Sequence, residues 1–172
     1  MTIIVGVLDG KGGCYMGGDS AGVGDDELQL RRDTKVFTVG CYLIGVCGSW
    51  RVMQLLRFSK PPKPNRTDPF KFMVTKFVPF LRELIKDEKD DTAKLPSFLI
   101  AFHGRLFHVY ADMQISEEVL PYEAAGSGAQ IARGALFAST LAPKAKVQVA
   151  LEAAERFNSN VRSPFHTIHQ KS

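Results

Sequence analysis

Short apolar segments rich in β-branched residues occur in two groups along the 172-residue chain, and this grouping restricts the fold more than any other feature. Segments of this kind are typical of strands that are buried on at least one face. The predicted strands cover residues 2–8, 14–18, 34–39, 42–47, 98–102, 106–110, 122–125 and 165–169. The first four form one group, and the next three form a second group after a long interval.

Two helical segments follow each group of strands. Ser49 is a suitable N-cap for the first helix, and the second runs from residue 69 to about residue 89 with a kink or break at Pro79. The third helix follows Gly128 and ends near Ser139, and the fourth covers residues 143–157. The remaining segments are predicted loops: residues 20–27, which are rich in glycine and aspartate, and residues 60–66, which hold three prolines.

This order of elements predicts two sheets packed face to face, with helices on the outside, in an α+β fold. The length suits one domain over residues 1–172, since a chain of this size buries a substantial core.

Thr2 is the first candidate for chemistry because it opens the first strand. Removal of Met1, which a small second residue favours, would leave a hydroxyl and a free α-amine on Thr2. The amine has an ordinary pKa of about 7.7–8.0, so it can accept the hydroxyl proton and activate the nucleophile. The alternative is an ordinary N-terminus, since many proteins begin with Met-Thr.

Asp19 and Lys35 are the second and third candidates. Asp19 ends the second strand and Lys35 starts the third, so both can lie beside the start of the first strand. A lysine there would stabilise the alkoxide of Thr2, and the aspartate would keep that lysine charged. The alternative is a surface ion pair without a catalytic role.

Gly48 and Ser127 complete the set of candidates. Gly48 lies where a strand meets a helix, a position from which its N–H can stabilise a developing oxyanion. Ser127 lies between Gly126 and Gly128 just before the third helix. Taken singly, each is more typical of a tight turn.

Together these features resemble the β subunits of the proteasome and the related bacterial HslV peptidase, which are N-terminal-nucleophile (Ntn) hydrolases. The resemblance rests on the order and spacing of the motifs along nearly the whole chain. The motifs are Thr2, Gly18-Asp19, Asp33-Thr34-Lys35-Val36, Gly45-Val46-Cys47-Gly48 and Gly126-Ser127-Gly128. The resemblance implies a four-layer αββα sandwich of two antiparallel sheets and a bacterial or phage source.

The resemblance also implies a role for each matched residue. Thr2 would be nucleophile and base, Lys35 would tune its pKa, and Asp19 would orient Lys35. The Gly48 N–H would bind the oxyanion, and Ser127 would assist the terminal amine. For substrate binding, the resemblance implies backbone contacts at Val23 and an apolar pocket for the residue before the cleaved bond, lined by Phe37, Val46 and Trp50.

The activity that follows from the resemblance is threonine-type peptide hydrolysis in a self-compartmentalising assembly. The implied partners are a polypeptide substrate, further copies of the chain in stacked homo-oligomeric rings, and an ATP-driven AAA+ unfoldase. Two alternatives remain open: a catalytically weak or inactive ring-forming scaffold, and an Ntn amidohydrolase that does not act on peptides.

The chain departs from the family pattern at two positions near the predicted site. The family has an aspartate and, three residues later, a serine that support the threonine amine, whereas this chain has Asn158 and Val161. Asparagine carries no charge and valine cannot form a hydrogen bond with its side chain. Retention of Met1 would also remove the base, because the Thr2 nitrogen would then belong to an amide.

Composition narrows the remaining classes of function. A net charge of +4 is too small to indicate nucleic-acid binding, and the chain lacks an apolar run long enough for a membrane span. Neither metal-ligand spacing nor a cofactor motif is present, so we expect no metal and no cofactor. Cys41 and Cys47 are predicted to be buried free thiols, which indicates a reducing compartment. Without a signal peptide, the expected location is cytoplasmic.

Overall fold

The structure is a computed structural model that describes residues 2–24, 27–86 and 96–171. Met1 and the predicted end of the second helix near residue 89 lie outside the described residues.

The first sheet has four antiparallel strands in the order β10-β1-β2-β11. These strands are β1 (Ile3–Leu8), β2 (Cys14–Gly18), β10 (Tyr122–Gly126) and β11 (His166–Gln170). At the start of β1, Ile3 pairs with Gly126 of β10 and Ile4 pairs with Gly18 of β2. The register therefore brings the ends of β2 and β10 beside Thr2.

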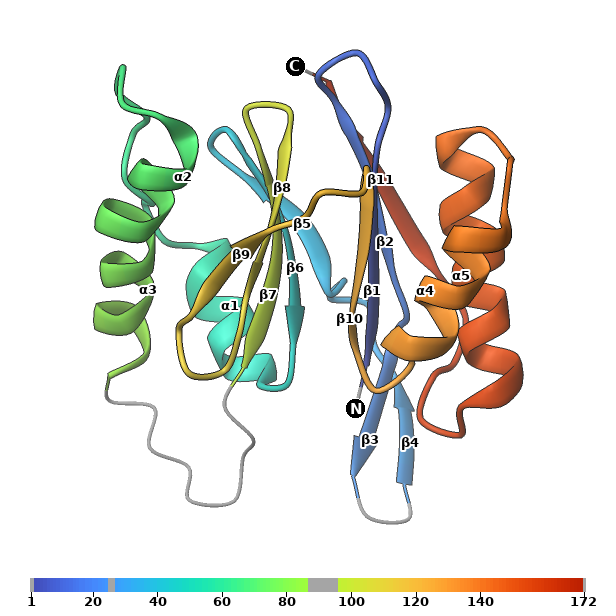
Figure 1. The fold of residues 1–172 in the computed structure, drawn as a ribbon. Coiled ribbons are helices and arrows are strands. Elements are labelled where there is room, and N and C mark those ends of the chain that lie inside the picture. Colours follow the sequence, from blue (N-terminus) through green and yellow to red (C-terminus); the bar gives the residue numbers. More distant parts are fainter. Residues whose placement is uncertain (1, 25–26, 87–95, 172) are drawn as a thin grey trace.

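The second sheet has five antiparallel strands in sequential order. They are β5 (Val36–Val39), β6 (Tyr42–Cys47), β7 (Ser97–Phe102), β8 (Arg105–Val109) and β9 (Ile115–Glu117). Two more strands, β3 (Ala21–Gly24) and β4 (Glu27–Leu30), form a separate hairpin that projects beyond the sheets in Figure 1.

Helices cover the outer face of each sheet (Figure 1). The second sheet is covered by α1 (Trp50–Arg57), α2 (Pro69–Phe72), the π-helical segment η1 (Met73–Phe77) and α3 (Val78–Ile85). The first sheet is covered by α4 (Ala129–Ala138) and α5 (Pro143–Phe157). The layers thus follow the order helix, sheet, sheet, helix, which confirms the predicted αββα fold.

Alternation along β1 shows how one strand serves two layers of the core. Ile3, Val5 and Val7 pack against α4 and α5, whereas Ile4 faces the second sheet and packs with Met16. Successive side chains of a strand point to opposite faces, so a strand that is apolar at every position is buried on both faces. The continuous apolar run at residues 3–8 is the sequence signature of this arrangement.

Two predictions about local structure were wrong, and one short strand was missed. Residues 20–27 are not a plain loop, because they hold β3 and the start of β4. The short strand β9 was not predicted. Cys41 is exposed, since it lies in the turn between β5 and β6, whereas Cys14 and Cys47 are buried and all three thiols are free.

The predicted break at Pro79 takes the form of a π-helical segment that ends at Phe77, just before the helical turn that contains Pro79. A proline cannot donate the backbone hydrogen bond of a regular α-helix, and the wider turns ahead of it accommodate this loss. Within the described residues, no helix is long and apolar enough to cross a membrane.

Candidate active site

Thr2 lies immediately before β1 and is 4% exposed. The carbonyl oxygen of Thr2 accepts hydrogen bonds from the Ser127 N–H at 2.8 Å and from the Ser127 hydroxyl at 3.2 Å. The Thr2 nitrogen lies 3.4 Å from the same hydroxyl oxygen. Ser127 therefore contacts both the nitrogen and the carbonyl oxygen of Thr2.

Gly126 makes the close approach of Ser127 possible. It has a φ of 104°, a conformation that side chains other than hydrogen disfavour. A Cβ atom at this position would lie 2.2 Å from the Thr2 carbonyl oxygen. The first glycine of the Gly-Ser-Gly motif is thus required by the contact with Thr2 as well as by its positive φ.

Asp19 connects Thr2 to Lys35. Its Oδ1 atom accepts hydrogen bonds from the Ile3 N–H at 3.0 Å and from Lys35 Nζ at 2.9 Å. Its Oδ2 atom accepts from the Ala21 N–H at 3.3 Å, and the Ala21 carbonyl accepts from Lys35 Nζ at 2.5 Å. Asp19 and Lys35 are 1% and 4% exposed, so the alternative of a surface ion pair is excluded.

Burial and the partner charge act in opposite directions on Lys35. Burial lowers the pKa of the Lys35 ammonium, and the charge and hydrogen bond of Asp19 raise it, with a net lowering. Burial alone disfavours a cation, and the Asp19 carboxylate counteracts this effect on Lys35. An ammonium in this place can stabilise a negative charge on a neighbouring oxygen.

Gly48 lies between β6 and α1 and has a φ of 106°. The next residue, Ser49, caps α1 by accepting a hydrogen bond from the Val52 N–H at 3.2 Å, as predicted. Gly48 therefore lies at the turn that leads from β6 into the capped helix α1.

The four predicted substrate-binding residues lie in two environments. Phe37 and Val46 are buried in the apolar cluster between the second sheet and α1 to α3, and half-buried Trp50 packs at the edge of this cluster. Lys35 Nζ lies 5.3 Å from the centre of the Trp50 ring, which places Trp50 beside the candidate site. Val23 pairs with Leu28 in the β3–β4 hairpin.

Arg31 and Arg57 were not predicted, yet both hold elements of the site. The Arg31 guanidinium lies 4.1 Å from the centre of the Trp50 ring and pairs with Asp33 at 2.8 Å. Arg57, from the end of α1, donates to the carbonyl oxygen of Thr34, next to Lys35. The contacts of Arg31 and Arg57 depend on the path of the chain between β4 and β5. No local pattern in the sequence predicts this path.

The two departures from the family pattern have different structural consequences. Asn158 caps the end of α5, where its side-chain amide donates to the Ser127 carbonyl at 2.8 Å. It therefore supports Ser127 without carrying a charge. Val161 is fully buried in the cluster around Ile3, where it contributes to packing.

Cys47 is a buried thiol next to this cluster of polar groups. Burial raises its pKa to about 12, so the thiol is neutral at physiological pH. A neutral, buried thiol is a poor nucleophile, which leaves Thr2 as the better candidate.

Across residues 2–24, 27–86 and 96–171, His, Cys, Asp and Glu side chains form no group of three or more that could hold a metal ion.

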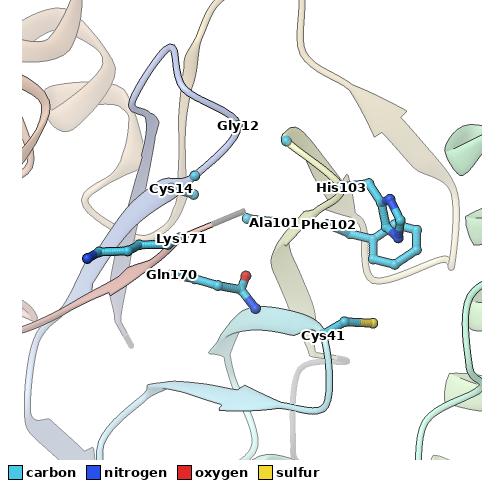
Figure 2. Close-up of a pocket in the computed structure, with 10 residues that line it drawn as sticks. Gly12, Cys14, Cys41, Ala101, Phe102, His103, Gln170 and Lys171 are labelled. Atoms are coloured by element: carbon cyan, nitrogen blue, oxygen red, sulfur yellow. The ribbon is translucent and has the colours of Figure 1, made fainter.

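A cavity of about 400 Å³ lies at the end of the sandwich remote from Thr2. It is lined by the turns that follow β1, β5 and β7 and by the end of β11, and Figure 2 shows Cys41, His103 and Gln170 among its lining residues. The length of β1, about 20 Å, separates this cavity from Thr2. None of the predicted site residues lines it.

Comparison with solved structures identifies this arrangement of layers. BPH from Thiobacillus denitrificans, solved in complex with epoxomicin, has a TM-score of 0.79 and 20% sequence identity, and the match covers 99% of this chain and 98% of that one. The chain has the fold of the proteasome-like Ntn hydrolases.

Two further Ntn hydrolases show how widely the fold is shared. HslV from Trypanosoma brucei has a TM-score of 0.72 and 16% identity, with 99% of this chain and 100% of that one covered. Anbu from Yersinia bercovieri has a TM-score of 0.72 and 18% identity, with coverage of 99% and 82%. No protein-family model and no curated protein matches the sequence.

Proposed function

We propose that the chain is a threonine peptidase whose nucleophile is the hydroxyl of Thr2, freed by removal of Met1. The observation that carries the proposal is the bridge formed by Asp19, which binds both Lys35 Nζ and the amide that follows Thr2. This bridge supports the proposal because it links a buried cation to the residue that follows the proposed nucleophile.

In the proposed reaction, the Thr2 hydroxyl attacks the carbonyl carbon of a peptide bond and gives its proton to the Thr2 α-amine. Lys35 stabilises the alkoxide, and the Gly48 N–H stabilises the tetrahedral oxyanion. Collapse of this intermediate forms an ester with Thr2, and the leaving amine takes the proton. Water then hydrolyses the ester, with the α-amine again acting as the base.

Labelling by epoxomicin, an epoxyketone, tests the nucleophile directly. We expect a covalent adduct on Thr2, seen by intact mass and located by peptide mapping, in chains that have lost Met1. The variant Thr2→Ala should form no adduct and hydrolyse no peptide, whereas Thr75→Ala, at an exposed threonine of η1, should behave like the wild type. Hydrolysis that persists in Thr2→Ala would rule out this nucleophile.

We further propose that the chain assembles into stacked rings that receive polypeptide substrates from an AAA+ unfoldase. The likeness to HslV supports this assembly. The predicted substrate contacts at Val23, Phe37, Val46 and Trp50 belong to the same proposal. Substitution Trp50→Ala should change the preference for the residue before the cleaved bond, measured with a set of peptide substrates.

An inactive ring-forming scaffold is the second candidate function. It is favoured by Asn158 and Val161, because the family pattern has an aspartate and a serine at these positions and neither replacement offers a carboxylate or a hydroxyl. Intact mass separates the two functions: full retention of Met1 favours the scaffold, and its loss favours the peptidase. Cleavage of small amides without cleavage of peptides would favour a different Ntn amidohydrolase.

A further inference from the structure

A groove of about 390 Å³ lies between α4 and the segment that connects β9 to β10. Glu118 and Leu120 of this segment line it, together with Glu123 of β10 and with Arg133 and Phe137 of α4. Because β10 and β9 are edge strands of the two sheets, the groove lies along one edge of the sandwich. The proposed chemistry uses none of these residues.

The groove carries more negative than positive charge. The Glu123 carboxylate, which is largely buried, pairs with Arg133 at 2.5 Å, and the Arg133 guanidinium also donates to the Ala124 carbonyl at 3.0 Å. Glu118 adds a second carboxyl group, which accepts a hydrogen bond from the Ser116 hydroxyl at 2.9 Å. Burial and the nearby Glu123 carboxylate raise the pKa of Glu118, so an added cation would be favourable here.

Large apolar side chains beside the groove are exposed. Phe137 is 80% exposed, Leu120 is 50% exposed and the adjacent Val119 is 99% exposed. Exposed apolar side chains gathered around a concave site are typical of surfaces that bind a partner. The groove therefore combines an apolar rim with an acidic wall.

The β3–β4 hairpin presents the complementary combination. Leu28 and Leu30 are 52% and 59% exposed, and they share one face of β4 because side chains alternate along a strand. Two residues later, Arg32 is exposed and forms no ion pair within the described part of the chain. The hairpin thus offers two apolar side chains followed by a cation.

The hairpin and the groove lie at opposite edges of the molecule. The hairpin lies between β2 and β5 in the chain. On that side of the molecule the edge strand of the first sheet is β11, which neighbours β2, and the edge strand of the second sheet is β5. The groove lies beside β9 and β10, the edge strands on the other side. A contact between two such surfaces can form only between different copies, and repeating it joins the copies head to tail.

We infer that the β3–β4 hairpin of one copy docks into the groove between α4 and the β9–β10 connection of a second copy. Leu28 and Leu30 pack against Leu120 and Phe137, and Arg32 faces Glu118. The inference rests on the assembly part of the proposed function and not on its chemistry.

Docking would also support the candidate active site. The hairpin begins at Ala21, whose N–H binds Asp19 and whose carbonyl binds Lys35. A second copy that holds the hairpin therefore fixes Ala21, which binds both Asp19 and Lys35. Assembly and a correctly placed Lys35 are expected to go together.

Exchanging the charges of Arg32 and Glu118 tests the contact. The measurement is sedimentation of the purified full chain. The wild type should sediment well above 19.0 kDa. Arg32→Glu and Glu118→Lys should each weaken association about tenfold or more, because like charges then face each other. The double variant Arg32→Glu/Glu118→Lys should recover most of the loss. Phe137→Gln, at an exposed position, should weaken association without affecting folding.

Lys144→Glu and Glu152→Lys, two exposed positions of α5, serve as matched charge reversals and should sediment as the wild type. Wild-type sedimentation of both Arg32→Glu and Glu118→Lys would overturn this contact and leave the proposed assembly standing. A wild type that stays at 19.0 kDa would overturn the contact and the assembly together. Epoxomicin labelling of Thr2 in that monomer would still support the proposed chemistry.

Discussion

At the scale of single residues, the candidate site depends on one carboxylate with several donors. Asp19 binds two backbone amides and one ammonium, and it does so at 1% exposure. Burial of a charged pair is costly unless the remaining lone pairs are satisfied, and here the backbone amides satisfy them. Asp19 therefore serves the fold around Thr2 as well as the charge on Lys35.

Substitution Asp19→Ala should lower the free energy of unfolding by about 3–5 kcal/mol, because it removes the carboxylate that balances the buried charge of the Lys35 ammonium. Urea denaturation measures this change. Glu83→Ala is the control, since it breaks an ion pair with Lys86 that lies on the surface. The control should change stability little. Equal effects of the two substitutions would contradict the role of burial.

Substitution Gly126→Ala should destabilise the chain and prevent labelling of Thr2. The positive φ alone costs about 1–3 kcal/mol for a residue with a side chain, and the new Cβ would collide with the Thr2 carbonyl oxygen. Gly134→Ala is the matched control, because that glycine lies within α4 with open space around it. The control should gain up to about 1 kcal/mol in helix stability. Thermal melts and epoxomicin labelling report both effects.

At the scale of elements, the sequence predicted those with a strong local signal and missed those without one. The capped helix after Ser49 and the continuous apolar run of β1 were predicted because hydrogen bonding and burial leave a clear pattern. The strand β9 has three residues, all half-buried, so neither periodicity nor an apolar run marks it. The β3–β4 hairpin is rich in glycine, aspartate and glutamate, a composition that favours loops.

The same contrast applies to the site. Thr2, Asp19, Lys35 and Ser127 were predicted because they stand at the ends of elements, and the antiparallel register then brings those ends together. The contact of Asn158 with Ser127 was not predicted, since it depends on where α5 ends relative to the turn after β10. A contact between elements 31 residues apart leaves no trace in local pattern.

The contact between β8 and β10 should make stability depend on pH. His108 is 5% exposed, its Nδ1 atom has no partner within the described residues, and burial lowers its pKa. The unfolded chain binds a proton near pH 6.5 that the folded chain excludes, so this group costs stability as the pH falls below about 6.5. Glu123 favours the charged imidazole and Arg133 opposes it.

The variant His108→Phe isolates this contribution. Glu118 acts in the opposite direction, because its raised pKa means that the folded chain holds its proton more tightly. Stability of the wild type between pH 7 and pH 5 is therefore a sum of the two effects. The loss of stability over this range should be smaller in His108→Phe than in the wild type, measured by urea denaturation. An identical pH dependence would show that His108 does not titrate on unfolding.

At the scale of the whole molecule, the two sheets share one inner layer. Ile4 and Met16 of the first sheet and Leu43 and Leu99 of the second are all fully buried in the cluster between the sheets. Each sheet also packs on its own helices, so the fold has three apolar clusters joined through two sheets. Sheets that share a buried face in this way should unfold together.

We therefore expect one cooperative unfolding transition for residues 1–172, and the single tryptophan provides the test. Trp50 reports on the layer of α1, whereas circular dichroism reports on all the helices and strands. Leu151→Ala, a fully buried position of α5, should cost about 2–5 kcal/mol and lower both midpoints equally. Leu56→Ala in α1 should do the same. If the α4–α5 layer unfolded by itself, Leu151→Ala would shift the circular dichroism transition and leave the Trp50 fluorescence transition unchanged.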